Sequence, residues 1–172
     1  MEHIYLIGFM GSGKSANGVK LSYLCRRTLT DTDALIEKKA KKSISEIFAQ
    51  DGEAAFREKE TEVLRELVKE NTPHIFAVGG GTPMREENRA LLQALGTVVF
   101  LRASAETVYE RVKNDTSRPL LQGGDPLDKI RRLLAERTPV YEALADVVVD
   151  VDGKEVAEVA EEILRRVRKR SI

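Results

Sequence analysis

A glycine-rich segment near the start of the chain reads Gly8-Phe9-Met10-Gly11-Ser12-Gly13-Lys14-Ser15. It fits the pattern G-x-x-x-x-G-K-[ST], which requires a buried strand before the loop and a helix after it. The short apolar run Ile4–Ile7 predicts the strand. The residues from Lys14 onward, with Val19, Leu21 and Leu24, predict the helix. The context that gives the motif its meaning is therefore present.

This loop has the chemistry to bind a polyphosphate. Glycines let the backbone turn and approach a ligand closely, so that several N–H groups converge on phosphate oxygens. We expect the donors to come from Gly11, Ser12, Gly13, Lys14, Ser15 and Ala16. The following helix points its positive end at the same place. Lys14 would reach the β- and γ-phosphates and the Ser15 hydroxyl would ligate Mg²⁺. The alternative is a glycine-rich turn without a ligand.

Composition narrows the class of protein. The chain has 172 residues, enough for one domain with a sizeable core, 1–172. Its 28 basic and 28 acidic residues cancel, so there is no general attraction to nucleic acid or an anionic membrane. The single cysteine, Cys25, excludes an internal disulfide. No apolar run is long enough for a signal peptide or a membrane span, and a cytoplasmic location is expected.

Five short apolar runs alternate with helical patterns along the chain, at Ile4–Ile7, Thr28–Asp31, Ile75–Val78, Thr97–Leu101 and Val147–Val149. This alternation predicts an α/β protein in which helices cover both faces of a parallel sheet. The polar segment 114–125 has no periodicity and is predicted to be a loop. A helix that starts after Asp125 is expected to end at Arg137, before Thr138-Pro139.

Two carboxylates follow the second strand. Asp31, at its end, is placed to serve Mg²⁺, as P-loop enzymes require. Asp33 lies two residues later, so in an extended segment both side chains would face the same side. One could serve the metal and the other accept a proton from an attacking hydroxyl. The alternative is an aspartate that caps a helix beginning at Ala34.

Arginines and glycines mark a second anion site. Arg57 lies on a predicted helix with Glu60 within reach, an arrangement also typical of a surface ion pair. Gly79-Gly80-Gly81 follows a strand, where glycines let a ligand approach the backbone. Arg118 lies in the polar loop and Arg137 before a Thr-Pro pair. Because arginine binds carboxylates bidentately, these residues suit a ligand that carries a carboxylate.

Taken together, these segments resemble the shikimate kinase family. The matching pieces run from residue 6 to about 152 and keep their order and spacing. They are the loop 8–15, Asp31-Thr32-Asp33, Ser43-Ile44 with Glu46-Ile47-Phe48, Gly52-Glu53, Phe56-Arg57 with Glu60, Gly79-Gly80-Gly81, Asn88-Arg89, Arg118-Pro119-Leu120-Leu121, and Arg137 with Tyr141. Only the P-loop is specific by itself, whereas the set as a whole is highly specific.

The resemblance implies a nucleoside-monophosphate-kinase-like fold with a five-stranded parallel sheet ordered 2-3-1-4-5. It implies transfer of the γ-phosphate of ATP to the 3-hydroxyl of shikimate, in aromatic amino-acid biosynthesis. Asp33 would hold the shikimate hydroxyls and take the proton. Arg57 and Arg137 would bind the carboxylate, with Glu60 orienting Arg57, and Gly79, Gly80 and Gly81 would line the site.

The resemblance also assigns the ATP site. Ser15 and Asp31 would serve Mg²⁺, while Lys14 and Arg118 would neutralise charge on the transferring phosphoryl group. Arg111 falls where the family packs an arginine against adenine. A helical region at about 33–61 would bind the substrate, and the segment 113–125 would be a lid that excludes water. We expect a monomer.

The chain departs from the family pattern at several positions. Ala16 replaces a threonine but keeps the backbone donor. Lys41 replaces a common glycine, which puts the local turn in doubt. Lys154 lies near a family arginine that holds adenine, and it cannot stack as arginine does. Two other functions remain as alternatives: a related kinase for gluconate or a nucleoside monophosphate, and a regulatory P-loop domain that binds nucleotide without catalysis.

Overall fold

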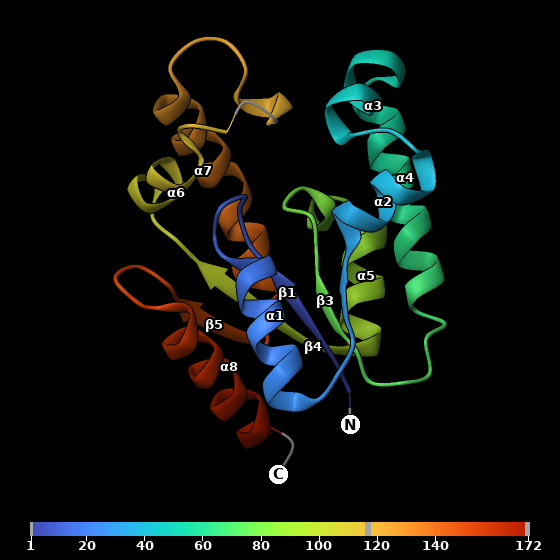
Figure 1. Ribbon diagram of the computed structural model, residues 1–172, viewed down its shortest axis with the longest axis vertical. Coiled ribbons are helices and arrows are strands. Elements are labelled where there is room, and N and C mark those ends of the chain that lie inside the picture. The colour runs from blue at the N-terminus through green and yellow to red at the C-terminus, as the bar shows by residue number, and fades with distance from the viewer. Residues whose placement is uncertain (1, 116–117, 171–172) are drawn as a thin grey trace.

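A five-stranded parallel sheet forms the centre of the molecule in the computed structural model, which describes residues 2–115 and 118–170 (Figure 1). The strands run in the order β2-β3-β1-β4-β5, which confirms the predicted topology. Their bounds are β1 His3–Ile7, β2 Leu29–Asp31, β3 Ile75–Ala77, β4 Gly96–Arg102 and β5 Val147–Asp150. All connections are crossovers, so the carboxyl ends of the strands lie at one edge, above the sheet in Figure 1.

Helices cover both faces of this sheet. On one face, α1 (Lys14–Cys25) and α8 (Val156–Arg170) pack against each other and against Ile4 and Leu6 of β1. On the other face, α5 (Glu86–Leu95), α6 (Ala105–Val112) and α7 (Pro126–Leu144) cover Tyr5 and Ile7. Successive residues of a strand point to opposite faces, and here both faces are buried. The central strand is therefore continuously apolar instead of alternating with polar residues.

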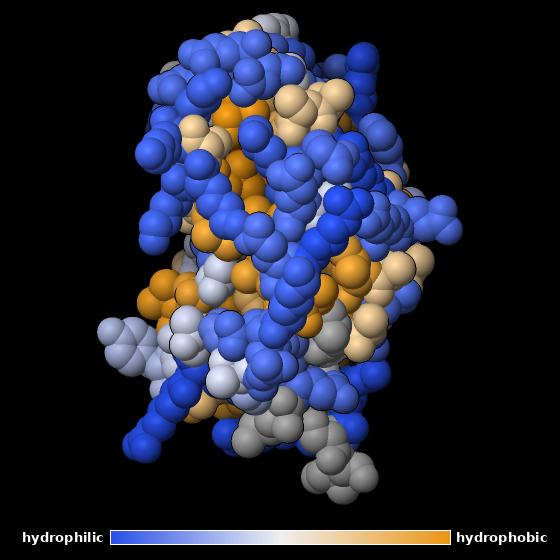
Figure 2. All heavy atoms as spheres, turned by 90° about the vertical axis from the view of Figure 1, so that its right-hand side faces the viewer, coloured by the Kyte–Doolittle hydropathy of each residue, from blue (hydrophilic) through white to orange (hydrophobic). Residues whose placement is uncertain are grey.

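Three helices extend from the β2 end of the sheet and have an apolar core of their own. They are α2 (Thr32–Ala40), α3 (Ile44–Asp51) and α4 (Glu53–Leu67), packed around Ile36, Ile47, Phe56 and Val63. The Ser43 hydroxyl accepts a hydrogen bond from the Glu46 amide at 3.1 Å and so caps the start of α3. Viewed from the α3–α4 side, the surface is mostly hydrophilic, with hydrophobic atoms visible in the hollows (Figure 2).

The prediction that a helix ends at Arg137 is wrong. Helix α7 continues to Leu144 with Pro139 inside it. An internal proline removes one helical hydrogen bond and costs roughly 3 kcal/mol in an exposed helix. In α7 the residues Ile130, Arg137, Tyr141 and Leu144 are buried on both sides of the proline. Burial of this face keeps the second half of the helix in place.

Two predictions about loops also need correction. Asp33 does not lie in an extended segment, because α2 already begins at Thr32 with Asp31 as its N-cap. The segment 114–125 is not wholly irregular: a 3₁₀ helix, η2 (Pro119–Leu121), buries Leu121. Residues 116–117 of the predicted lid lie outside the described part of the chain. Lys41 adopts a left-handed conformation with φ 54°, so the turn that glycine usually makes forms here with lysine.

Within residues 2–115 and 118–170, no helix is long and apolar enough to cross a membrane.

Candidate active site

The P-loop joins β1 to α1 and has the backbone that the motif requires. Gly11 and Gly13 adopt φ values of 73° and 95°, which residues with a side chain rarely adopt. A Cβ atom on Gly8 would lie 2.7 Å from the Leu101 carbonyl oxygen, so only glycine fits there. The Lys14 ammonium group donates to the carbonyl oxygens of Gly8 and Phe9 at 2.8 and 2.9 Å. The loop is thus closed around its own lysine, at the start of a helix.

A cavity of about 180 Å³ opens beside this loop. Its lining includes Gly13, Lys14, Ser15, Ala16 and both aspartates. The Ser15 hydroxyl donates to Asp31 Oδ2 at 2.7 Å, while Asp31 Oδ1 accepts from the amides of Asp33 and Ala34. Asp31 therefore caps α2, and its other carboxylate oxygen contacts Ser15 of the loop. A hydroxyl and a carboxylate oxygen in contact form an oxygen-only donor set that suits Mg²⁺.

A larger cavity of about 270 Å³ adjoins the first, between α2–α4 on one side and η2 and α7 on the other. Predicted residues in its lining are Asp33, Arg57, Glu60, Gly80, Gly81, Arg118 and Arg137. Other lining residues had no predicted role, although Met10, Ser43, Pro119 and Leu120 lie in segments that match the family; the others are Glu37 and Ser45. Met10 comes from the P-loop and Glu37 from α2, whereas the packing of α3 and η2 brings the rest here. Phe48 and Phe56 are both apolar core and cavity wall, with ring centroids 5.0 Å apart.

Arg57 and Glu60 form a largely buried ion pair and not an exposed pair on the surface. The guanidinium donates to Glu60 Oε1 at 2.7 Å, and Glu60 is only 3% exposed. The other Glu60 oxygen accepts from the Thr82 hydroxyl. Glu60 is therefore fully engaged and fixes the direction of Arg57 toward the glycine turn. A Cβ on Gly81 would lie 2.2 Å from Arg57 Nη1, which explains the glycine at that position.

Arg137 approaches the same turn from α7. Its guanidinium lies over the Phe9 ring, 5.6 Å from the ring centroid, and 3.5 Å from the position of a Cβ on Gly80. Arg137 is only 5% exposed, yet none of the described carboxylates forms an ion pair with it. A buried cation without an anion is costly. This geometry therefore favours an anionic ligand in the cavity.

Asp33 and Lys14 lie where the two cavities meet. Both cavities share Asp33, Arg118 and Met10 in their linings. Burial, with the nearby Glu60 charge, raises the pKa of Asp33 to about 6 against the opposing effect of Lys14. Burial likewise lowers the pKa of Lys14 to about 8, against the effect of Asp33. A carboxylate that lies between two cavities and has a pKa near neutral pH has the position and the pKa of a general base.

Arg118 enters from the predicted lid. It lines both cavities, and its Nε donates to Asp115 at 3.0 Å. Helix η2, which follows Arg118, contacts α3 across the larger cavity. The segment thus places a cation over the junction at which Asp33 and Lys14 meet.

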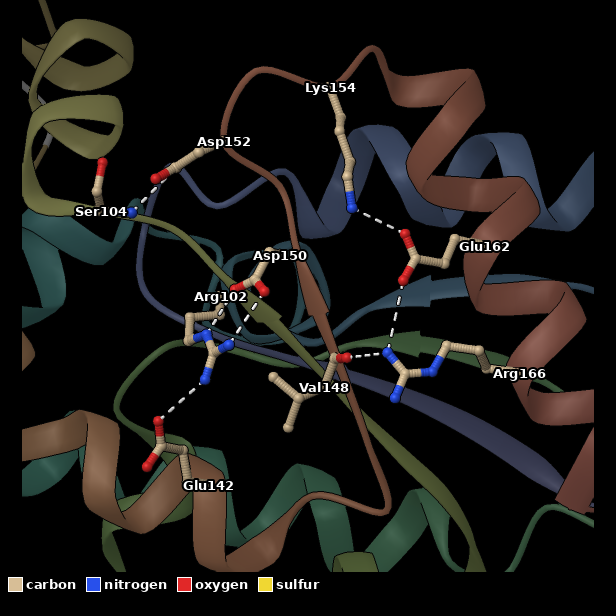
Figure 3. A network of polar contacts seen from close by, with 9 residues as sticks. All are labelled: Arg102, Ser104, Glu142, Val148, Asp150, Asp152, Lys154, Glu162 and Arg166. Atoms are coloured by element: carbon tan, nitrogen blue, oxygen red, sulfur yellow. Dashed lines mark hydrogen bonds and ion pairs between the residues drawn. The ribbon is translucent and has the colours of Figure 1, made fainter.

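A third cavity, of about 240 Å³, lies on the other side of the P-loop. Arg111 and Lys154 both line it, together with Ala16, Asn17 and Val156. Arg111 donates to the Gly11 carbonyl oxygen at 2.9 Å, so its guanidinium is fixed to the P-loop. Lys154 instead turns to α8, where its ammonium group donates to Glu162 at 2.8 Å (Figure 3). Both residues that were predicted near adenine thus line this cavity. The P-loop fixes Arg111, whereas Lys154 has a competing partner, Glu162.

Comparison with known proteins agrees with this geometry. The family model described as shikimate kinase matches residues 10–168. A shikimate kinase of Paracidovorax citrulli is 43% identical over 162 residues, which cover 93% of this chain and 88% of that protein. A solved structure of shikimate kinase from Acinetobacter baumannii in complex with shikimate matches with a TM-score of 0.97 and 35% identity, covering 100% of this chain and 96% of the other. The chain belongs to the shikimate kinase family.

The fold is shared more widely than the family. A gluconokinase of Sinorhizobium meliloti matches with a TM-score of 0.59 at 18% identity, covering 98% of this chain and 92% of the other. At that identity the match shows the fold alone. The fold by itself therefore does not select an acceptor, and the choice depends on the residues of the larger cavity.

Proposed function

We propose that this protein transfers the γ-phosphoryl group of ATP to the 3-hydroxyl of shikimate, giving shikimate 3-phosphate and ADP. Its membership of the shikimate kinase family supports this activity. The observation that carries it is the position of Asp33, which lies between the P-loop cavity and a cavity whose buried arginine, Arg137, forms no ion pair with the described carboxylates. A carboxylate-bearing alcohol is the kind of acceptor that fits both features.

The acceptor would be held at three points. Arg57, oriented by Glu60, and Arg137 would bind its carboxylate, while the turn Gly79-Gly80-Gly81 would let the ring approach the backbone. Asp33 would accept hydrogen bonds from the hydroxyls and take the proton of the attacking oxygen. A base of pKa about 6 is ionised at neutral pH and is still able to accept that proton.

The phosphates would lie over the P-loop. Backbone amides of Gly11, Ser12, Gly13, Ser15 and Ala16 would cradle them at the N-terminus of α1. Lys14 would exchange its two carbonyl contacts for phosphate oxygens, and Arg118 would join it over the transferring group. Two cations there would offset the negative charge that develops during transfer. Arg111, with Lys154, would border the adenine base.

Ser15 and Asp31 would hold Mg²⁺, which neutralises phosphate charge when it is bound. Among residues 2–115 and 118–170, no group of three or more histidine, cysteine or acidic side chains could hold a metal ion by itself. A metal shared with nucleotide phosphates and water needs fewer protein ligands. The Ser15–Asp31 contact supplies them and prepares the two oxygens before the nucleotide arrives.

The segment 113–125 would close over the reacting groups as a lid, with 33–61 as the acceptor-binding region. Closure would exclude water and so prevent wasteful hydrolysis of ATP. The contact between η2 and α3 supports this assignment, because it already bridges the two sides of the larger cavity. A monomeric state and a cytoplasmic location remain predictions.

ADP release with Mg·ATP, measured with and without shikimate, tests the proposal. We expect release to depend on shikimate and not on quinate, gluconate or AMP at equal concentration. Release driven by gluconate or AMP would replace the acceptor with that of a related kinase. Nucleotide binding with no release in any mixture would favour the regulatory P-loop alternative.

A further inference from the structure

The larger cavity, called the acceptor cavity from here on, has the Tyr141 side chain behind it. Tyr141 has no role in the function described so far. Tyr141 is on α7, four residues after Arg137, and is fully buried. Its ring packs against Phe100 with the centroids 5.0 Å apart. Its hydroxyl donates to the Gly80 carbonyl oxygen at 2.5 Å. The only hydroxyl hydrogen is thus committed to the glycine turn.

The same hydroxyl meets Arg137. Burial raises the pKa of Tyr141 to about 12, and the positive charge of nearby Arg137 acts in the opposite direction. A guanidinium group only donates hydrogen bonds, so toward Arg137 the phenol oxygen is available as an acceptor. Tyr141 therefore connects the two parts that meet at the cavity, the turn after β3 and helix α7.

We propose that Tyr141 is a positioning residue for acceptor recognition, which fixes Arg137 relative to Gly80 so that the arginine presents its free edge to the acceptor carboxylate. This inference deepens the proposed function and rests on it. Arg137 has the ring of Phe9 on one side and no carboxylate partner among the described residues. Glu60 fixes Arg57 in the same way on the other side of the turn. Tyr141 would do for Arg137, with a neutral hydroxyl, what Glu60 does with a charge.

A neutral partner has a chemical advantage here. A carboxylate at the place of the phenol would satisfy Arg137 and compete with the ligand. A phenol of high pKa stays neutral at working pH, orients the guanidinium and leaves its charge for the acceptor. Both protein carboxylates near the two arginines, Glu60 and Glu53, pair with Arg57. The anion for Arg137 would then come from the ligand.

The chain contains a matched control for this idea. Tyr5 is also buried, and its ring stacks on Phe76 at 5.1 Å. Its hydroxyl has no hydrogen-bond partner among the described residues. Tyr141→Phe and Tyr5→Phe therefore each delete one buried hydroxyl from the same side of the sheet, but only the first deletion removes a hydrogen bond to the site.

The test compares both variants with the wild-type protein for KM of shikimate, KM of ATP, kcat and Tm. We expect Tyr141→Phe to raise KM for shikimate about tenfold, since it removes the hydrogen bond that ties α7, and with it Arg137, to the glycine turn. KM for ATP should change less than twofold, and Tyr5→Phe should leave all kinetic constants unchanged. Shikimate should also shift the Tm of Tyr141→Phe less than that of the wild type, which tests the idea even if the variant is less stable.

A double-mutant cycle with Arg137→Ala shows whether Tyr141 acts through the arginine. In that background, Tyr141→Phe should no longer change KM for shikimate. A full effect without Arg137, or equal changes in both KM values, would overturn the inference in favour of a purely structural role. If Tyr141→Phe lowered Tm but left KM for shikimate unchanged, the inference would be wrong while the proposed function stood. Failure of the wild-type protein to use shikimate would instead remove the proposed function itself.

Discussion

The P-loop and the acceptor cavity share Asp33 and Arg118, but they are built in opposite ways. The P-loop is one continuous segment, and the ligand contacts expected of it are mainly backbone amides shaped by glycine. The acceptor cavity is lined by residues from α2, α3, α4, η2 and α7, together with Gly80-Gly81 and Met10. Backbone geometry depends on local sequence, whereas a convergence of side chains depends on packing. We therefore expect mutations in the two regions to affect different kinetic constants.

Asp33→Asn should have the largest effect because it removes the group that both regions share. We expect kcat to fall about 10³-fold, as for loss of a general base, while ATP still binds. The raised pKa means that ionised Asp33 destabilises the fold above pH 6, so this variant should be more stable than the wild type at pH 7.5 by about 3 kcal/mol. Single-turnover kinetics, ATP titration and denaturant unfolding measure the three quantities.

Asp51→Asn is the control for that variant, because Asp51 is exposed and pairs only with Lys42 on the surface. Near-normal turnover of Asp33→Asn would contradict its role as the base.

Arg57→Ala should distinguish most clearly between acceptor binding and ATP binding. It removes a cation that touches the acceptor cavity and not the P-loop cavity. We expect KM for shikimate to rise about 100-fold, the scale of a lost charge-assisted bidentate contact, with KM for ATP within twofold. Arg65→Ala on the same helix is the control, since Arg65 pairs with exposed Glu87. Equal changes in both KM values would mean that the two regions are not separate binding sites.

The pH dependence of kcat/KM should report the ionisation of Asp33, which both regions share, and of Lys14 in the P-loop. Asp33 must be ionised and Lys14 protonated, so kcat/KM should fall below pH 6 and above pH 8. The free energy of unfolding should decrease over the acid range in which kcat/KM increases with pH. The raised pKa of Asp33 favours the folded state at low pH, and this contribution is lost as pH rises from about 4 to 6. Rates in overlapping buffers and chemical unfolding at each pH check both trends, and an acid limb unchanged in Asp33→Glu would argue against Asp33 as its source.

Lys154→Ala should have the smallest effect. Its ammonium group is already paired with Glu162, and a lysine cannot stack on a base as arginine can. We expect KM for ATP to rise less than threefold, with KM for shikimate unchanged. Glu162→Gln should free the lysine, and improved ATP binding in that variant would show that the pair holds Lys154 back from the nucleotide. Initial rates measure the two KM values, and calorimetry with ADP measures nucleotide binding by both variants.

The sequence by itself determined the features that depend on neighbours along the chain. The continuous apolar runs and their alternation with helices defined the parallel sheet and its layers, because a strand buried on both faces has no polar side. The P-loop was defined by glycines whose backbone requirement is local. The helix start at Asp125 followed from a side chain that caps the next turn.

Only the tertiary structure decided the features that depend on distant partners. Pro139 looks like a helix end in sequence, but burial of Arg137 and Tyr141 on either side keeps α7 continuous. Glu60 looks like half of a surface pair until α4 places it under Thr82 and the glycine turn. The pKa of Asp33 likewise depends on its burial beside Glu60 and Lys14. Local backbone preferences are recorded in the sequence, whereas desolvation and the pairing of charges arise only when the elements pack together.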